Sequence, residues 1–529
     1  MKRYIYFLIC FLLFSSLSHA ADRYWVAAAN GNWNDTNNWS TTSGGTSGAS
    51  VPGTSDIAYF DANSTFDCTI DAVVNIAGMS IQLGYTGTID QGAFSITVGN
   101  NDFQIADGTF TGGTGAMDIN DAFVISGGVF TAPSDQLTIQ GDFTHSAGTF
   151  NHNNGSVTFD GTGNRTLTLP SPPQEFYTVA VSMANTKKLT ITSGDTLKVL
   201  NQLALNDGLL ETGDALVVDT CVVNSGWDNG SANLHFVESG ASYYIFNDDE
   251  WSGNNVYVNK TNDTDTVYVQ DEDGDNSVSF GNTNRNLDIL EGVLNFESDL
   301  TVDLNFGNLI VRSGGTLMGS DNQINYQGNY NNTGGNFVHN SGTFRFDGVG
   351  NRTFTMASPA HEFYTVEISM AHTKRLSITT GDTLKVLNRL ELNNGLLQTG
   401  DVAVVDSCVV NNGWDNGSAD LHFVESGDSY YIFNDAEWNG NNVYINKASD
   451  TDIVHVQDED GDNSISFGNS NKDLDILEGI LSFQSGLTAD LNFGDLIIRS
   501  GGTLIGSDHQ INYQGSYNNT GGNFIHNSG

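Results

Sequence analysis

Two acidic loops hold the residues best suited to chemistry. The stretch VQDEDGDNSVSFGN begins at Val269, and nearly the same letters return at Val456. In each loop three aspartates alternate with other residues, namely Asp271, Asp273 and Asp275 in the first and Asp458, Asp460 and Asp462 in the second. Carboxylates at positions 1, 3 and 5 are the monodentate calcium ligands of an EF-hand loop. The spacing therefore predicts two calcium (Ca²⁺) sites.

The other positions of the loop match an EF-hand only in part. Ser277 and Ser464 stand at position 7, which contributes a backbone carbonyl, and Asn276 replaces the glycine of the sharp turn. Asparagine tolerates the left-handed conformation of such a turn better than most residues. At position 12 Asn282 replaces the bidentate glutamate, so we expect weak binding, with a dissociation constant of roughly 10⁻⁴ to 10⁻³ M.

Further ligands would have to come from outside the loop. No flanking helices are predicted, so a neighbouring coil, or the nearby Asp263 and Asp265, would have to complete the coordination shell. The alternative interpretation is an acidic turn that only water solvates. A rise in melting temperature on addition of calcium would distinguish the two.

A second dense stretch combines aromatic and acidic residues. LHFVESGASYYIFNDDEW begins at Leu234, contains His235, Tyr243 and Trp251, and recurs from Leu421. Aromatic rings beside carboxylates are typical of sugar-binding grooves, whereas stacked aromatic rows are common in the core of a β-helix. Both interpretations remain open from the sequence.

Residues for catalysis are sparse. Arg165, Lys187, Lys198 and Lys260 fall in no recognisable cluster with acids, and zinc-protease, nucleophile-elbow and phosphate-loop motifs are absent from the sequence. The duplication has also copied coils, corners and acidic loops uniformly, without one elaborated cleft. We therefore predict no catalytic residue and no enzyme activity. The alternative is a polysaccharide lyase or hydrolase built on a β-helix.

The loops lie in a large tandem repeat. GNRTLTL begins at Gly163 and GNRTFTM at Gly350, which gives an offset of 350 − 163 = 187. Two copies follow, 142–328 and 329–515, and 516–529 matches the start of a third. Because a folding unit does not end there, we expect a longer protein with further copies and a C-terminal sorting or anchoring segment.

A shorter repeat predicts the elements that must position the loops. Phenylalanine recurs at one constant interval, at Phe103, Phe123 and Phe143, within short stretches that alternate apolar and polar residues. Such alternation predicts β-strands, and no helical period persists. Equivalent apolar residues must stack from coil to coil, because one coil cannot bury its own apolar side. We therefore predict an all-β fold, a right-handed parallel β-helix (β-solenoid), with coils of about 20 residues over 67–141.

The N-terminal segment differs from the coils. Basic residues, an apolar run and small residues up to Ala20 predict a secretory signal peptide over 1–20. RYWVAAANGNWNDTNNWS follows, and we predict a Trp-rich N-terminal cap module over 21–66 that covers the first coil. A platform for stacking sugars is the alternative. No later apolar run is long enough to span a bilayer.

The composition of the chain limits the kinds of partner that it can bind. The net charge of −43 repels nucleic acid and anionic lipid, so we expect no nucleic-acid partner and favour cations. The alternative is that the charge only keeps a repetitive surface soluble. Cys10 belongs to the signal peptide, and Cys68, Cys221 and Cys408 are too few and too widely spaced for a disulfide framework. We expect Cys221 and Cys408 to be small buried hydrophobic residues.

The Trp-rich opening carries a resemblance. RYWV, GNWNDTNNWS and SGGTSGASVPGTSDIAYFDANS together resemble the start of large secreted and cell-surface proteins of Bacteroidota that look like adhesins. This resemblance implies β-solenoid repeats, the type IX secretion route, an extracellular or cell-surface location and an adhesive or structural role. It carries over no catalytic residue, and the sequence holds no sorting domain of that class.

These observations together predict a stalk. We expect a secreted or cell-surface β-helix with repeated low-affinity calcium loops, whose copies present equivalent weak sites to polysaccharide or to a host or neighbouring cell surface. Several weak sites on one chain raise avidity without any single tight site. The alternatives are a polysaccharide-active enzyme and a passive spacer for a missing C-terminal domain.

Overall fold

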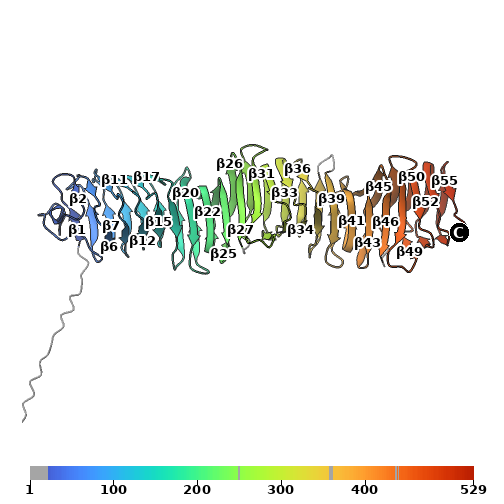
Figure 1. Ribbon diagram of the computed structural model, residues 1–529, viewed down its shortest axis with the longest axis horizontal. Coiled ribbons are helices and arrows are strands. Elements are labelled where there is room, and N and C mark those ends of the chain that lie inside the picture. Colours follow the sequence, from blue (N-terminus) through green and yellow to red (C-terminus); the bar gives the residue numbers. More distant parts are fainter. Residues whose placement is uncertain (1–21, 248–250, 357–360, 435–437, 439) are drawn as a thin grey trace, which may run out of the picture. The chain divides into compact units, whose positions relative to one another are not determined.

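The fold is a parallel β-solenoid of about 21 turns, which confirms the predicted all-β class (Figure 1). The computed structural model describes residues 22–247, 251–356, 361–434, 438 and 440–529. The predicted signal peptide, with Cys10, lies outside the described residues. In the described part the only helix is the 3-10 turn η1, Thr36–Asn38, so no helix there has the length and apolar character needed to cross a bilayer.

The chain forms two compact units. Unit 1 comprises Met1–Gly161 and Arg165–Pro170, and unit 2 comprises Thr162–Asn164 and Ser171–Gly529.

Unit 1 consists of three ladders of short parallel strands. The first ladder contains β1 (Asp22–Trp25), β4 (Ile57–Phe60), β7 (Gly78–Ile81), β10 (Phe103–Ile105), β13 (Phe123–Ile125), β16 (Phe143–His145) and β19 (Arg165–Thr168). The second contains β2 (Gly31–Asn32), β5 (Cys68–Thr69), β8 (Thr88–Asp90), β11 (Thr109–Thr111), β14 (Val129–Thr131) and β17 (Thr149–Asn151). The third contains β6 (Val74–Ile76), β9 (Ile96–Val98), β12 (Met117–Ile119), β15 (Gln136–Ile139) and β18 (Ser156–Phe159).

The interval predicted from the phenylalanines corresponds to one coil of unit 1. Phe103 pairs with Phe123, and Phe123 with Phe143, in direct register on neighbouring strands. All three rings are 0% exposed, and both ring pairs lie 5.2 Å apart in edge-on packing. Each buried ring contributes about 1.5–3 kcal/mol of hydrophobic stabilisation. The interior therefore selects the register, since a slip by one residue would turn the rings outward.

The three N-terminal tryptophans pack inside unit 1, as the cap prediction requires. Trp25, Trp33 and Trp39 are almost fully buried, and Trp39 meets the other two rings at centroid distances of 5.3 and 4.8 Å. The Trp39 Nε1–H donates to the Trp33 carbonyl at 2.8 Å. The short strand β3 (Trp39–Ser40) runs antiparallel to β1, unlike the parallel ladders. Rings this deeply buried present no face on which a sugar could stack.

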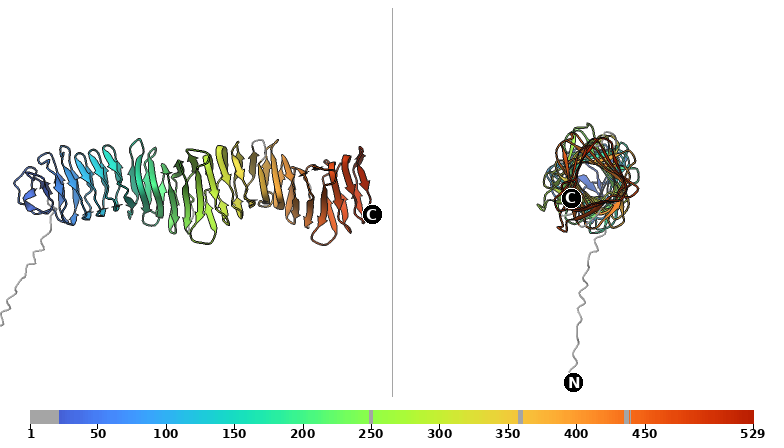
Figure 2. Two further views of the ribbon diagram at one scale, coloured as in Figure 1. Left: turned by 45° about the horizontal axis from the view of Figure 1, so that its top comes forward. Right: turned by 90° about the vertical axis from the view of Figure 1, so that its right-hand side faces the viewer.

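Unit 2 has longer strands, and the longest of them pair with more than one strand of a neighbouring coil. Its first part contains β20 (Gln174–Ser182), β21 (Lys188–Ile191), β22 (Thr196–Glu211), β23 (Asp214–Val217), β24 (Thr220–Asn224), β25 (Trp227–Gly230), β26 (Asn233–Glu238), β27 (Ser242–Asn247), β28 (Val256–Lys260), β29 (Thr266–Asp271), β30 (Ser277–Phe280), β31 (Asn286–Phe296), β32 (Thr301–Leu304), β33 (Asn308–Met318) and β34 (Gln323–Tyr326). Successive coils of this unit follow one another from green to red in Figure 2.

The rest of unit 2 contains the strands of the second copy of the large repeat and of residues 516–529. Its strands are β35 (Asn329–Asn332), β36 (Asn336–Val338), β37 (Thr343–Phe346), β38 (Arg352–Met356), β39 (Glu362–Ser369), β40 (Arg375–Ile378), β41 (Thr383–Gln398), β42 (Asp401–Val404), β43 (Ser407–Asn411), β44 (Trp414–Gly417), β45 (Asp420–Glu425), β46 (Ser429–Asn434), β47 (Val443–Lys447), β48 (Ile453–Asp458), β49 (Ser464–Phe467), β50 (Asp473–Phe483), β51 (Thr488–Leu491), β52 (Asp495–Ile505), β53 (Ile511–Tyr513), β54 (Ser516–Asn519) and β55 (Asn523–Ile525). One coil of this unit is longer than those of unit 1, because Gly292 lies in register with Gly315.

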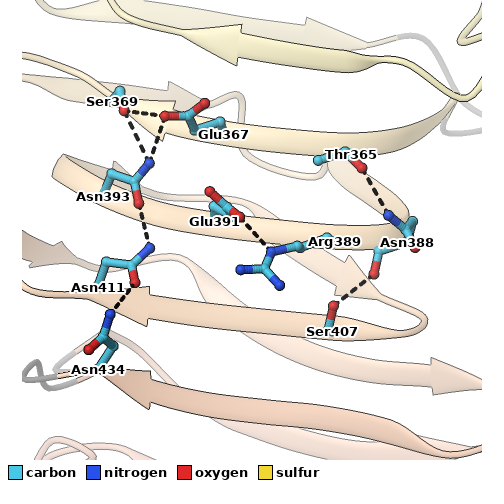
Figure 3. Close-up of polar contacts among 10 residues, drawn as sticks. All are labelled: Thr365, Glu367, Ser369, Asn388, Arg389, Glu391, Asn393, Ser407, Asn411 and Asn434. Atoms are coloured by element: carbon cyan, nitrogen blue, oxygen red, sulfur yellow. Dashed lines mark hydrogen bonds and ion pairs between the residues drawn. The ribbon is translucent and has the colours of Figure 1, made fainter. Parts of the chain in front are cut away.

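An asparagine ladder links coils of unit 2 through side chains (Figure 3). Asn393 Nδ2 donates to Glu367 Oε1 at 2.6 Å, Asn411 Nδ2 to Asn393 Oδ1 at 2.5 Å, and Asn434 Nδ2 to Asn411 Oδ1 at 3.1 Å. The earlier copy has the same ladder, through Ser182, Asn206, Asn224 and Asn247. Each amide both donates and accepts along the stack, so the ladder favours this register of the coils.

Cys68, Cys221 and Cys408 are free cysteines, and the predicted burial of Cys221 and Cys408 is confirmed. Cys68, Cys221 and Cys408 are each 0% exposed. Burial raises the pKa of each thiol above its ordinary value.

Candidate metal centre

Each acidic loop lies at a corner of unit 2, where the chain passes from one ladder to another. The first loop follows β29, which pairs with β27 and β31, and leads into β30, which pairs with β32. The second loop stands at the equivalent corner between β48 and β49. Paired strands therefore hold both ends of each loop.

The first loop folds around the carboxylate of Asp271. The backbone N–H groups of Gly274 and Asn276 donate to Asp271 Oδ2 at 3.1 and 2.9 Å. Gly274 has φ +89° and Asn276 has φ +57°. The left-handed conformation predicted for Asn276 is therefore confirmed, and it turns the backbone amides toward the first aspartate.

The three carboxylates of this loop converge. Candidate ligand oxygens of Asp271, Asp273 and Asp275 all lie within 4.8 Å of one another. Asp271 is half-buried, whereas Asp273 and Asp275 are exposed. Each pair of such anions repels by about 1 kcal/mol at 4 Å in bulk water. A bound hard cation, which prefers oxygen ligands, would attract all three carboxylates and so offset this repulsion.

The second loop reproduces this geometry. Gly461 and Asn463 donate their backbone N–H groups to Asp458 Oδ2 at 3.2 and 2.9 Å. Candidate oxygens of Asp458, Asp460 and Asp462 again lie within 4.8 Å of one another. The other carboxylate oxygen of Asp458 is buried and finds no hydrogen-bond donor among the described residues. The two loops thus form equivalent sets of carboxylates able to hold a metal ion.

The remaining predicted positions contribute to the turn. Ser277 and Ser464 open strands β30 and β49, and each backbone N–H donates at 2.7 Å to the last aspartate of its own loop. Asn282 Oδ1 accepts the backbone N–H of Asn284 at 3.0 Å. Asn282 therefore closes a turn of its own, and position 12 supplies no carboxylate.

Asp263 and Asp265 do not join the first triad. Asp265 Oδ2 accepts the side-chain amide and the backbone N–H of Asn262 at 2.9 and 3.2 Å. The hydrogen bond from the Asn262 side chain, followed by one from the Gly240 backbone, lowers the pKa of Asp265. On the neighbouring coil Glu297 accepts a hydrogen bond from Gln270 at 2.5 Å. The triads are thus groups of three, without a fourth carboxylate among the described residues.

The aromatic stretch divides between interior and surface. Tyr244 and Trp251 are 0% exposed and belong to the core, as the packing interpretation predicts. His235 faces outward and stacks on Tyr257 of the next coil at 4.4 Å and 19°. Residues 248–250 of this stretch, all three of them acidic, lie outside the described residues.

Two candidate basic residues are held by neighbours. Lys198 Nζ bridges Glu175 at 2.8 Å and Glu238 at 2.5 Å; burial works against its charge, but the two glutamates outweigh burial and raise its pKa. Lys260 is 3% exposed and donates to Ser242 Oγ at 2.7 Å. Burial lowers the pKa of Lys260. Among the described residues, neither lysine forms an ion pair with an aspartate of the acidic loops.

Sequence reasoning missed one further group. Asp401, Asp420 and His422, on strands β42 and β45, also place candidate ligand atoms within 4.8 Å of one another. The signal in the sequence was a difference between the copies, because Asp420 stands where the first copy has Asn233.

A polar groove lies on the outer face of unit 1. Its volume is about 440 Å³, and it is lined by Ile57, Tyr59, Met79, Ser80, Gln82, Asn100, Asn101, Asp102, Gln104 and Asp121. Tyr59 stacks on Tyr24 at a centroid distance of 4.9 Å. The groove therefore combines one aromatic face with several amides and carboxylates.

Comparisons with protein-family models, with curated proteins and with solved structures found no match for this chain. The fold and the site together define its class as a long parallel β-solenoid protein of about 21 turns, with acidic triads able to hold metal ions.

Proposed function

We propose that this chain is a secreted or cell-surface β-solenoid stalk that binds calcium at its two acidic loops and presents a weak glycan site, which many chains on one surface would make multivalent. The supporting observation is that two identical triads stand at equivalent corners, each with its ligand oxygens within 4.8 Å. The adhesin-like location and role, including type IX secretion, rest on the resemblance of the Trp-rich opening to Bacteroidota surface proteins.

Calcium is the cation that suits these loops. All candidate ligands are oxygens, the loops are open to water, and calcium accepts irregular shells of 6–8 oxygens, whereas magnesium demands a near-ideal octahedron. Three carboxylates without a bidentate glutamate match the weak binding of extracellular modules, with Kd of roughly 10⁻⁴ to 10⁻³ M. Bound calcium would also reduce self-repulsion in a chain of net charge −43.

The groove of unit 1 supports glycan as the partner. Amides and carboxylates such as Asn101, Asp102 and Gln104 can exchange hydrogen bonds with sugar hydroxyls, and the ring of Tyr59 can pack against a pyranose face. A single groove of this kind binds weakly. Attachment of many chains to one surface would supply the avidity.

Thermal denaturation in calcium and in chelator tests the metal sites. At about 10 mM calcium a Kd of roughly 10⁻⁴ to 10⁻³ M stabilises the chain by about 1.4–2.7 kcal/mol per loop. Asp271→Ala with Asp273→Ala should remove one increment, and Asp458→Ala with Asp460→Ala the other. Asp263→Ala, an exposed acid outside the triad, is the matched control and should keep both. A melting temperature that ignores calcium, or a response that survives both double substitutions, would refute the proposal.

A panel of immobilised polysaccharides tests the partner. Retention without release of products supports the adhesin-like role, whereas release of products would identify a polysaccharide-active enzyme. If the chain is not retained and releases no products, it is a spacer. Tyr59→Ala should weaken retention. Tyr268→Ala, which removes a ring stacked on Tyr243 in unit 2, should leave retention unchanged.

A further inference from the structure

One row of side chains on the outer face of unit 2 changes character between the two copies. In the first copy it runs through Asp214, Asn233, Asn255, Asn286 and Asn308, and in the second through Asp401, Asp420, Asn442, Asp473 and Asp495. These positions are equivalent under the large repeat, and the strands that carry them pair in the same register. Three asparagines of the first copy are therefore aspartates in the second.

In the first copy, hydrogen bonds connect the side chains at the beginning of this row. Asn233 Nδ2 donates to Asp214 Oδ1 at 2.8 Å, and His235 Nε2 lies 3.2 Å from the same oxygen. One carboxylate thus accepts from two neighbours, and no second charge is present at the Asn233 position.

The second copy lacks this arrangement. Asp420 has no amide to donate, and it is the direct register partner of Asp401, so two carboxylates stand side by side on adjacent strands. Like charges placed directly opposite each other destabilise a strand pair. Among the described residues, no lysine or arginine forms an ion pair with Asp401 or Asp420. The chain itself therefore supplies no fixed cation for this pair.

His422 completes the group. Its Nε2 is buried, makes no hydrogen bond to any described residue, and lies 3.6 Å from Asp401 Oδ1. The neighbour of His422 on strand β42 is Ala403, whereas His235 has the larger Leu216 in the same register. The side chain beside the histidine ring is therefore smaller in the second copy.

We propose that Asp401, Asp420 and His422 bind a divalent transition-metal ion, with Zn²⁺ as the representative of the class. An imidazole nitrogen with two carboxylates suits zinc and its neighbours, whereas calcium and magnesium prefer oxygen alone. Zinc holds nitrogen and oxygen ligands at about 2.0–2.2 Å, so tetrahedral ligand atoms lie roughly 3.3–3.5 Å apart. The observed 3.6 Å between His422 Nε2 and Asp401 Oδ1 is close to this separation.

Neighbouring residues orient two of the ligands. Tyr444 stacks on the ring of His422 at 4.4 Å and 15°, and the Asn442 N–H donates to Asp420 Oδ1 at 3.0 Å. Partners that fix the ring plane and the carboxylate are typical of metal sites. Three protein ligands leave a fourth position for water or for a ligand atom of another molecule.

Zinc titration of the whole chain by calorimetry, in saturating calcium so that the acidic loops are filled, tests this proposal. The first variant is Asp420→Asn, which installs the residue that the first copy carries at the same place and leaves the fold intact there. We expect it to weaken zinc binding by at least about tenfold, the loss typical of even an outer-shell change. His422→Ala should do the same. The reciprocal pair Asn233→Asp with Leu216→Ala should add one zinc equivalent to the first copy.

Comparing the variants with the wild type separates zinc bound at the proposed site from zinc bound elsewhere on the chain. Any zinc bound by exposed histidines such as His372 and His509 should be the same in the wild type and in Asp420→Asn, so only the difference between the two proteins counts. Equal affinity and stoichiometry in these two proteins would overturn the proposal, as would zinc binding that His422→Ala leaves unchanged. Complete displacement of zinc by calcium would identify a site for hard cations and overturn the assignment to transition metals.

Discussion

Interrupting the asparagine ladder at Asn411 should loosen the coils on both sides of it (Figure 3). Asn411→Ala removes the hydrogen bond to Asn393 at 2.5 Å and the one from Asn434 at 3.1 Å. A neutral hydrogen bond contributes about 0.5–1.5 kcal/mol, and these amides are half-buried, so we expect a loss of about 1–2 kcal/mol. This loss corresponds to an increase of about 5–30-fold in the frequency of local opening.

Hydrogen exchange measures this change within one molecule. Peptides from β43 and β46 should exchange faster in the variant, while the equivalent peptides from β24 and β27 of the first copy serve as an internal reference. Asn284→Ala removes an exposed asparagine outside the ladder and should change stability by less than about 0.5 kcal/mol.

Two results would refute the reasoning. Unchanged exchange in β43 and β46 would show that the ladder adds nothing to the strand pairing. Equal acceleration in both copies would show that the substitution acts on the whole fold and not on adjacent coils. A double-mutant cycle with Asn393→Ala should further yield a coupling of about 0.5 kcal/mol or more, since the two side chains share one hydrogen bond.

Two more predictions concern buried polar groups. Burial lowers the pKa of Lys260 and Lys447, so between that lowered pKa and the ordinary lysine value of about 10.4 the unfolded chain binds more protons than the folded chain. The free energy of unfolding, measured by urea titration, should therefore rise as the pH approaches that value and fall as the pH drops. Lys260→Met with Lys447→Met should flatten this dependence of the free energy on pH. An unchanged pH dependence would contradict the prediction. Cys68, Cys221 and Cys408 are buried with raised thiol pKa values, so iodoacetamide should label none of them in the native chain and all three in urea. Labelling of any one under native conditions would show that its coil opens readily.

The sequence predicted the coil because its periodicity is strict. Phe103, Phe123 and Phe143 face one another at the expected interval, and the left-handed Asn276 follows from residue type alone. Both inferences rest on local chemistry that every coil must satisfy. Ligands from outside the loop could not be predicted in the same way, and Asp265 caps its own turn with Asn262.

By itself, the sequence determined the repeat length, the all-β solenoid, the buried tryptophans and the composition of the two acidic loops, because each depends on spacing along the chain. Only the tertiary structure decided which side chains of different coils meet. Asp401 and His422 belong to successive coils, and strand register brings their ligand atoms to 3.6 Å. Periodicity shows that coils stack, but the path of each corner sets which residue lies over which. Asp420 replaces the Asn233 of the first copy, and only the pairing of the strands shows that this replacement creates a candidate metal site.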